Sequence, residues 1–92
     1  MILGISTINN YWRVSMLRIK DELNNIFGIV LKVPPKKNKI NLNYRNVEKW
    51  DSLNHVKLIL LLESKFKIKI SSIDSLKLIS YKNILNYLNK KR

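Results

Sequence analysis

Cysteine is absent from this chain of 92 residues, which excludes a disulfide-stapled miniprotein, a thiolate metal site and a thiol nucleophile. Only 2 glycines and 2 prolines are present and 46% of the residues are hydrophobic, so the chain is too apolar to be a disordered basic tail. The longest apolar run, Leu58 to Leu62, is far shorter than the roughly 18 to 20 residues that span a bilayer. We therefore expect one small soluble cytoplasmic domain with a single core.

Acidic residues are also scarce, with 6 Asp and Glu against 18 Lys and Arg, and the formal net charge is +12. A small basic domain is typical of nucleic-acid binding, because cations neutralise phosphates. The chain is also rich in Ile, Asn and Lys and contains neither Ala nor Gln, a bias that codon usage alone can produce. Charge therefore leaves two interpretations open: a small basic helical nucleic-acid-binding module, or a solvated surface with no polyanionic partner.

The first segment, residues 1–14, lacks the basic start and the small-residue cleavage site of a secretory signal. Ile5, Ile8 and Trp12 are spaced as on one face of a short amphipathic helix, but a disordered extension is equally compatible with the sequence. We expect the folded domain to cover residues 15–92.

A helical pattern begins near Ser15, which is a plausible N-cap. Charged and amide side chains occupy the opposite face, and Pro34-Pro35 prevents the helix from continuing. This predicts a first helix over residues 15–31. Its apolar positions recur at spacings of three and four: Met16, Ile19, Leu23, Ile26, Phe27 and Val30.

The next segment, residues 32–50, is a long Lys- and Asn-rich connection without a clear period. A loop of this length is unusual in a compact domain unless it packs on the core. Apolar residues punctuate it, so we expect it to lie on the helices, and we interpret residues 35–39 as a solvated turn in preference to a basic knuckle. These apolar residues are Val33, Ile40, Leu42, Tyr44, Val47 and Trp50.

A second helix is expected to start at Asp51-Ser52 and to run through Phe66. Its apolar positions form more than one stripe, which is typical of a central helix packed on several sides. They are Leu53, Val56, Ile59, Leu60, Leu62 and Phe66.

Two further helices complete the pattern. The alternation of Ile68 and Ile70 has no second strand to pair with, so we interpret it as a connection. Ser71 or Ser72 then caps a short helix through Lys77. Ser80 caps a fourth helix with an apolar face of Tyr81, Ile84, Leu85 and Leu88, and residues 89–92 are expected to fray. The fold class is therefore all-α, a small bundle of three to four helices with a long first loop.

One local sequence stands at the start of the second helix: Trp50-Asp51-Ser52-Leu53-Asn54-His55-Val56-Lys57-Leu58. It resembles the phosphopantetheine attachment motif of acyl carrier proteins, in which Asp-Ser-Leu is followed by an apolar helix. The resemblance continues without a gap from Asp51 to Leu88 and covers the first helix more loosely. The tripeptide alone is unspecific, but its helical context over some seventy residues is specific.

The resemblance implies that Ser52 anchors 4'-phosphopantetheine, which a phosphopantetheinyl transferase attaches covalently from coenzyme A. An acyl or aminoacyl cargo would then ride as a thioester on the arm, and the chain would be a carrier and not an enzyme. It further implies that Asp51 helps to hold the metal and coenzyme A in the transferase complex, with Trp50, Leu53 and His55 as the rest of the recognition motif. A monomer and partner enzymes that load and use the acyl group are expected.

Simpler interpretations stand beside these roles. Ser52 can be a mere N-cap, Asp51 can cap the helix and pair with its dipole, and His55 can be an exposed histidine without a role. A helix N-terminus nevertheless favours an anion, which suits a phosphodiester on Ser52. A hydrolase triad of Asp51, Ser52 and His55 is rejected, because all three share one helical turn and no oxyanion hole is evident. A single His and scattered carboxylates also argue against a resident metal.

A second Asp-Ser-Leu, at residues 74–76, opens no long apolar helix and is interpreted as coincidence. By resemblance, an acyl chain would enter between the second and third helices, while plain core packing is the simpler interpretation of the residues there. The residues expected to line that region or the core are Leu53, Val56, Leu60, Ile73, Leu76 and Leu78.

The charge departs from the family's usual pattern. Typical acyl carrier proteins are acidic and meet basic partners, whereas here the second helix carries Lys57 and Lys65 against Glu63, and Lys49-Trp50 replace the usual small residues. Complementary potential selects partners, so we expect enzymes with acidic or apolar docking faces and no role for nucleic acid.

Overall fold

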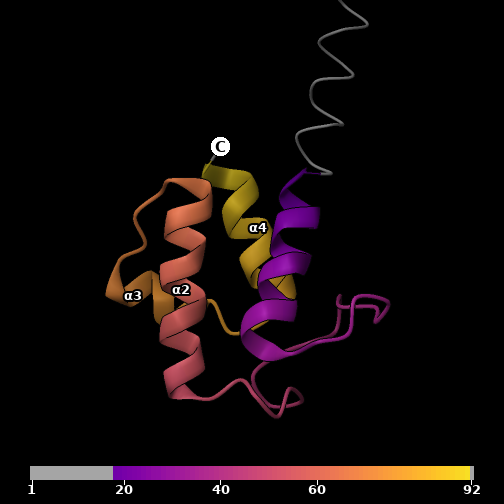
Figure 1. Ribbon diagram of the computed structural model, residues 1–92. Coiled ribbons are helices and arrows are strands. Elements are labelled where there is room, and N and C mark those ends of the chain that lie inside the picture. Colours follow the sequence, from indigo (N-terminus) through magenta and orange to yellow (C-terminus); the bar gives the residue numbers. More distant parts are fainter. Residues whose placement is uncertain (1–17, 92) are drawn as a thin grey trace, which may run out of the picture.

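The computed structural model describes residues 18–91, and these fold into four helices joined by loops (Figure 1). The first helix covers residues 18–31, and it is followed by α2 (Ser52–Phe66), α3 (Ser72–Lys77) and α4 (Tyr81–Lys91). Within residues 18–91 the β-pairing is a single isolated bridge, and no strand is present. The expected all-α fold with a long first loop is confirmed.

The helices form a small bundle in which the first helix and α2 lie side by side and run in opposite directions (Figure 1). In this view α4 lies behind that pair, and the short α3 lies beside α2 on the side away from the first helix. The N-terminus of α2 therefore lies at one end of the bundle, next to the C-terminal end of the first helix and near α3.

The core is built around Phe27, whose ring meets two other aromatic rings edge-on. The ring centroids lie 5.4 Å from Trp50 and 5.2 Å from Tyr81, the separation and orientation that aromatic pairs prefer. The first helix, the long loop and α4 thus meet at one residue. The buried apolar side chains are Ile19, Leu23, Ile26, Phe27, Leu31, Val33, Leu42, Val47, Trp50, Leu58, Ile59, Leu62, Leu78, Tyr81, Ile84 and Leu88.

Side-chain caps define the helix starts. Asp51 caps α2, Ser71 caps α3, and the Ser80 hydroxyl accepts the amide of Asn83 at the start of α4. Of the two serines considered for α3, Ser71 is the cap. The first helix and α2 both end at a lysine with left-handed backbone, Lys32 at φ 59° and Lys67 at φ 54°.

The long loop lies on the core through Val33, Leu42, Val47 and Trp50, as its pattern predicts. Ile40 and Tyr44 are exposed instead, because the loop makes local turns around them. Hydrogen bonds join the Tyr44 amide to the carbonyl of Ile79, and the Tyr81 amide to the carbonyl of Leu42.

The turn after the two prolines is more closely packed than predicted. Residues 35–37 do form a turn, but Lys39 is only 5% exposed, and its ammonium donates to the carbonyl oxygens of Pro35 and Lys37 at 3.2 and 3.1 Å. A buried ammonium needs such partners, since desolvation without them is costly. The expectation of a fully solvated turn is wrong at Lys39.

Two predictions about the chain ends have different outcomes. The predicted N-terminal segment, residues 1–14, and the start of the first helix at Ser15 lie outside the described residues. At the other end α4 continues to Lys91, so the expected fraying from Asn89 is wrong. Leu88 is buried and holds this last turn, and Lys90 and Lys91 interact favourably with the helix dipole there.

The buried face of α2 also differs from the predicted one. Leu58, Ile59 and Leu62 are buried, whereas Leu53, Val56 and Leu60 are exposed. Counting apolar residues could not separate the two faces, because both carry large aliphatic residues at helical spacing. Helix α2 is therefore packed on one face and presents an apolar stripe to its surroundings on another.

Candidate functional site

The N-terminus of α2 is set by Asp51. Its carboxylate accepts the amide of Asn54 at 2.8 Å, and its carbonyl accepts the amide of His55 at 2.8 Å. The side-chain amide of Asn54 donates back to the carbonyl of Lys49 at 2.7 Å, which holds the entering chain against the first turn. The predicted capping role of Asp51 is confirmed.

Ser52 is the first residue of α2 and is exposed. The N-cap is Asp51, so the simpler interpretation of Ser52 as the cap is wrong. The hydroxyl stands at the positive end of a helix that has no acidic residue in its first turn. An anion attached there is favoured by the helix dipole and by first-turn amides that have no acceptor within the helix.

Trp50 is 5% exposed and connects the core to this turn. One side of its ring meets Phe27, and on another side it lies edge to edge with the His55 ring, with 6.3 Å between the centroids and 22° between the planes. The indole Nε1 donates to His55 Nδ1 at 3.0 Å. His55 Nε2 in turn lies 2.9 Å from the carbonyl oxygen of Ser75 and 3.3 Å from its hydroxyl.

His55 is thus a half-buried side chain that joins α2, the long loop and α3. The interpretation of an exposed histidine without contacts is wrong. Ser75, set aside with the second Asp-Ser-Leu, provides the contact on α3. The sequence signal that could have indicated the contact between Trp50 and His55 is their spacing, with the tryptophan five residues before the single histidine of the chain.

A cleft of about 460 Å³ opens beside Ser52. It has the motif on one side and the end of α3 on the other, so a group attached to Ser52 has an adjacent hollow in which to lie. Tyr44 and Ile79 belong to this cleft and were not among the predicted site residues. Tyr44 was assigned to the apolar residues of the loop, and Ile79 lies far from the motif in sequence. The lining residues are Tyr44, Trp50, Asp51, Ser52, His55, Leu76 and Ile79.

The residues expected between the second and third helices occupy two different environments. Leu78 is buried in the core, as predicted. The core interpretation is wrong for Leu53, Val56, Leu60, Ile73 and Leu76, which are between 55% and 75% exposed. The reason is the short length of α3: six residues cannot cover the outer stripe of α2.

Part of this stripe borders a second open cleft, of about 340 Å³, which is lined by Val56 and Leu60 of α2 and by Leu76 of α3. Leu76 belongs to this cleft and to the one at Ser52. Apolar surface therefore extends from the motif along α2. Reception of an acyl chain there stays a prediction.

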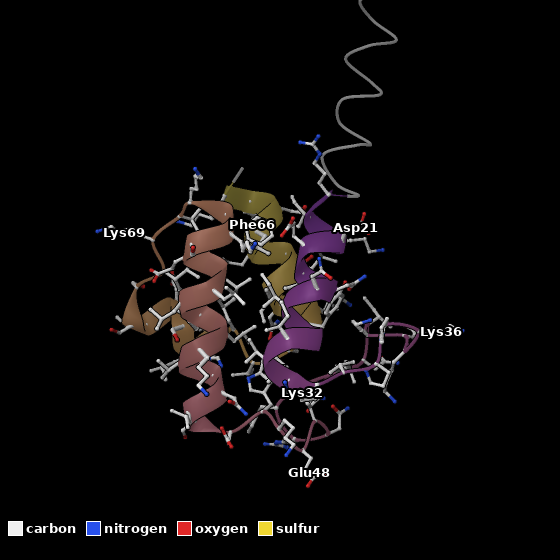
Figure 2. All side chains as sticks on the ribbon, viewed as in Figure 1. Asp21, Lys32, Lys36, Glu48, Phe66 and Lys69 are labelled. Carbon is white, nitrogen blue, oxygen red and sulfur yellow. The ribbon has the colours of Figure 1, made fainter. Side chains whose placement is uncertain are left out.

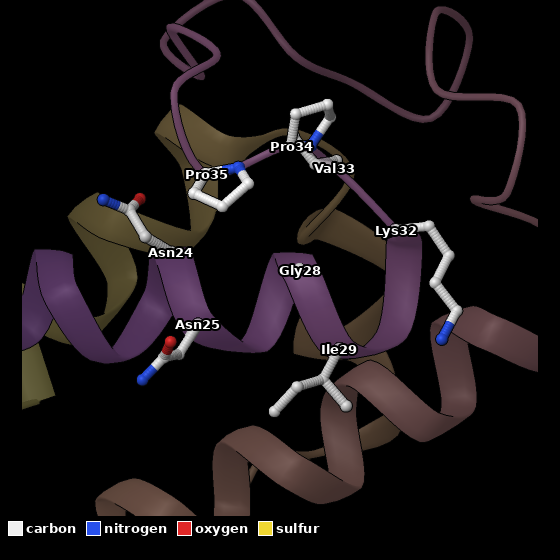
Figure 3. Close-up of a pocket in the computed structure, with 8 residues that line it drawn as sticks. All are labelled: Asn24, Asn25, Gly28, Ile29, Lys32, Val33, Pro34 and Pro35. Atoms are coloured by element: carbon white, nitrogen blue, oxygen red, sulfur yellow. The ribbon is translucent and has the colours of Figure 1, made fainter.

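A larger hollow, of about 510 Å³, lies where Pro34 and Pro35 fold back along the first helix near Gly28 (Figure 3). None of the motif residues lines it. Ile29 projects from the helix on the side opposite the prolines (Figure 3), and it is shared with a cleft of about 400 Å³ between the first helix and the start of α2.

That cleft between the first helix and α2 is basic. Lys32, Lys49 and Lys57 line it together with Ile29, Val30 and Asn54. Lys32 stands at the end of the first helix, as Figure 2 shows. We call these three lysines the basic rim, and it reaches the N-terminal turn of α2 through Lys57 and Asn54.

Helix α3 has a second polar tie, on α4. The Tyr87 hydroxyl donates to the Asp74 carboxylate at 3.0 Å. Partial burial raises the pKa of Tyr87, and the hydrogen bond to Asp74 and its negative charge raise it further. Burial likewise raises the pKa of Tyr81, with the charge of Asp21 adding to the effect.

The arrangement suits a covalently held anionic group better than a catalytic centre. Ser52 is accessible, its first turn attracts a phosphate, and an open cleft with apolar walls lies beside it. Within residues 18–91 no group of three or more potential metal ligands is found, and no helix there is long and apolar enough to cross a bilayer. A phosphopantetheine arm on Ser52 therefore fits the residues present.

Comparison with known proteins finds a relative over most of the chain. The chain is 30% identical to the acyl carrier protein of Campylobacter curvus over 74 residues, which cover 80% of this chain and 96% of that protein. No family model matches the chain.

Proposed function

Because the chain belongs to the acyl carrier protein family, we propose that it holds an acyl or aminoacyl group as a thioester on a phosphopantetheine arm attached to Ser52. The observation that carries this proposal is the position of Ser52. It is exposed as the first residue of the 15-residue α2, which Asp51 caps, and it lies beside an open cleft. When bound, the arm supplies the terminal thiol that the chain lacks, since no cysteine is present.

The chain's own residues prepare this attachment. Asp51 fixes the first turn by accepting the amide of Asn54, so the adjacent hydroxyl of Ser52 is not needed as the cap. The helix dipole and first-turn amides favour the phosphate at that hydroxyl. We infer that Asp51 also faces the transferase, while Trp50 and His55 shape the wall past which the arm leaves the helix.

Attachment is tested by incubating the protein with coenzyme A and a broad-specificity phosphopantetheinyl transferase and measuring intact mass. Wild type is expected to gain one arm, Ser52→Ala none, and Ser75→Ala one arm as in wild type. Ser75 is the matched control, because it lies in the same tripeptide on another helix. Transfer to Ser75, or no transfer by any transferase tried, contradicts the proposal.

The basic rim supports a further element of the proposal, namely partner enzymes with acidic docking faces. Lys32, Lys49 and Lys57 surround apolar Ile29 and Val30, next to the turn that carries Ser52. A partner that places carboxylates around an apolar side chain would complement this surface, and like-charged partners would be repelled. The rim lies on the first-helix side of α2, so docking there leaves the Ser52 cleft accessible from the α3 side.

A charge reversal tests the docking surface. With a basic-faced fatty-acid ketosynthase as probe and low salt, the loaded wild type is expected to react slowly, and Lys57→Glu several-fold faster. Lys90→Glu is the control, since it changes the net charge equally at the far end of α4. If the ketosynthase accepts the loaded wild type as efficiently as an acidic carrier, the docking proposal is contradicted. The same holds if Lys57→Glu and Lys90→Glu increase the reaction rate equally.

The nucleic-acid alternative makes a different prediction. A binding module would retain duplex or single-stranded nucleic acid with an affinity that falls steeply as salt rises. Such binding by a protein that cannot be modified at Ser52 would favour this alternative over the carrier function.

A further inference from the structure

Helix α3 is attached to the rest of the fold mainly through polar contacts. None of its six residues is buried, and apolar burial resumes only at Leu78, which follows it. Within the described residues, two side chains tie it outward by hydrogen bonds: His55 to Ser75, toward α2, and Tyr87 to Asp74, toward α4. The His55 contact lies on the side of the Ser52 cleft.

The neighbours of His55 determine where its proton lies. An indole Nε1 can only donate, so His55 Nδ1, at 3.0 Å from it, must be the acceptor and carries no proton. The proton of the neutral ring is then on Nε2, which lies 2.9 Å from the carbonyl oxygen of Ser75, an atom that can only accept. The neutral Nε2–H tautomer is therefore the form that makes both bonds.

From this geometry we propose that His55 is a positioning residue that latches α3 to Trp50 and so holds the α3 wall of the cleft beside Ser52. The latch needs the Nε2–H form of the ring, because a proton on Nδ1 would place two donors against each other at Trp50. The consequence for an attached arm, a cleft wall held in place beside it, rests on the proposed function, whereas the latch itself does not.

Several charged or titratable groups lie on the elements that pack against His55. Asp51 and Tyr44 line the same cleft, and the loop before Trp50 carries Lys49. On α3 the groups are Asp74, whose carboxylate is already bonded to Tyr87, and Lys77. The test is therefore made at pH 8, where carboxylates are ionised and the charges around the ring stay constant.

The first experiment reads the tautomer directly. Nitrogen-15 NMR of the imidazole in the unmodified protein at pH 8 is expected to show protonated Nε2 and unprotonated Nδ1. A predominant Nδ1–H tautomer, or a mixture of tautomers typical of a free ring, overturns the proposal.

The second experiment measures hydrogen exchange of the Leu78 amide, which donates to the same Ser75 carbonyl at 3.2 Å. Relative to wild type at pH 8, His55→Phe is expected to lower its protection factor about tenfold, the effect of one or two lost neutral hydrogen bonds. Phenylalanine keeps an aromatic ring against Trp50.

Tyr87→Phe is the matched control, because it removes the other tie of α3 without touching the ring of His55. Its protection factor is expected to fall while the Nε2–H tautomer of His55 persists. Unchanged protection in His55→Phe, or loss of the Nε2–H tautomer in Tyr87→Phe, contradicts the latch. Because all measurements use the unmodified protein, failure of Ser52 to accept an arm would leave them unaffected.

Discussion

Helices α2 and α3 both carry Asp-Ser-Leu, yet they are held in place by different forces. The 15-residue α2 buries three apolar side chains, while the six-residue α3 buries none and relies on polar contacts made by His55 and Tyr87. Hydrophobic burial is nondirectional and strong, whereas a single hydrogen bond is directional and contributes little net stability. The bundle therefore combines a firmly packed helix with a weakly attached one on the two sides of one cleft.

The same tripeptide also occupies different positions in the two helices. In α2 the aspartate is the N-cap and the serine is N1, so the hydroxyl stands free at the helix start. In α3 the cap is Ser71, and Asp74-Ser75 lie within the helix and are engaged by Tyr87 and His55. The chemistry open to a serine thus depends on where the helix begins.

The largest expected difference concerns burial. Leu62→Ala in α2 should lower the free energy of unfolding by about 2–5 kcal/mol, because it empties a fully enclosed site. Leu76→Ala in α3 should change it by less than about 0.5 kcal/mol, because that side chain is exposed. Urea denaturation measures both, and a comparable loss from Leu76→Ala would remove the distinction between the helices.

The caps should show the same contrast on a smaller scale. Asp51→Ala should cost about 1 kcal/mol of global stability, since it removes the acceptor of the Asn54 amide. Ser71→Ala, which removes the acceptor of the Asp74 amide, should instead act locally on α3. Denaturation should therefore detect the first variant, and hydrogen exchange of α3 the second. A global loss from Ser71→Ala as large as that from Asp51→Ala would mean that α3 does not open separately.

Salt should separate global from local stability. The net charge of +12 opposes compaction, so moderate salt should raise the melting temperature by a few degrees, about the effect of 1 kcal/mol or less in a domain of this size. The His55 latch joins neutral groups, so the protection of Leu78 relative to the core should stay unchanged. A flat or falling melting temperature would show that the cations are locally compensated.

Alkaline pH should have the smallest effect and act on the other tie of α3. The pKa of Tyr87 is raised in the fold, so its contribution is fully present below the tyrosine value of about 10 in the unfolded chain. It is lost as pH rises through the raised pKa, by less than about 1 kcal/mol for this partly exposed group. Tyr87→Phe should reduce the decline of stability above pH 10 in denaturation curves, and an identical decline in that variant would exclude Tyr87 as its source.

Helix existence and capping could be predicted from the sequence because they depend on local spacing and on residues such as Asp51 and Ser80. The buried face of α2 could not, since Val56 and Leu60 differ from Leu58 and Leu62 only in what packs against them. That depends on the length of α3, a tertiary property.

The candidate site divides in the same way. Ser52 and Asp51 could be found from the motif, and Asp51 is confirmed as the cap. Ile79 and Ser75 could not, because the fold alone brings them to the motif. For Lys39, the charge suggested exposure, but nearby carbonyl groups satisfy its ammonium within the loop.

The left-handed lysines at the two helix ends leave room to engineer this protein. Such a conformation is normally taken by glycine, which this chain uses at only 2 positions, and a side chain there costs about 1 kcal/mol. Lys67→Gly would relieve that strain away from the basic rim, whereas Lys32→Gly would remove one of the rim's three charges. Lys67→Gly therefore changes stability alone, whereas Lys32→Gly changes stability and the charge of the rim together.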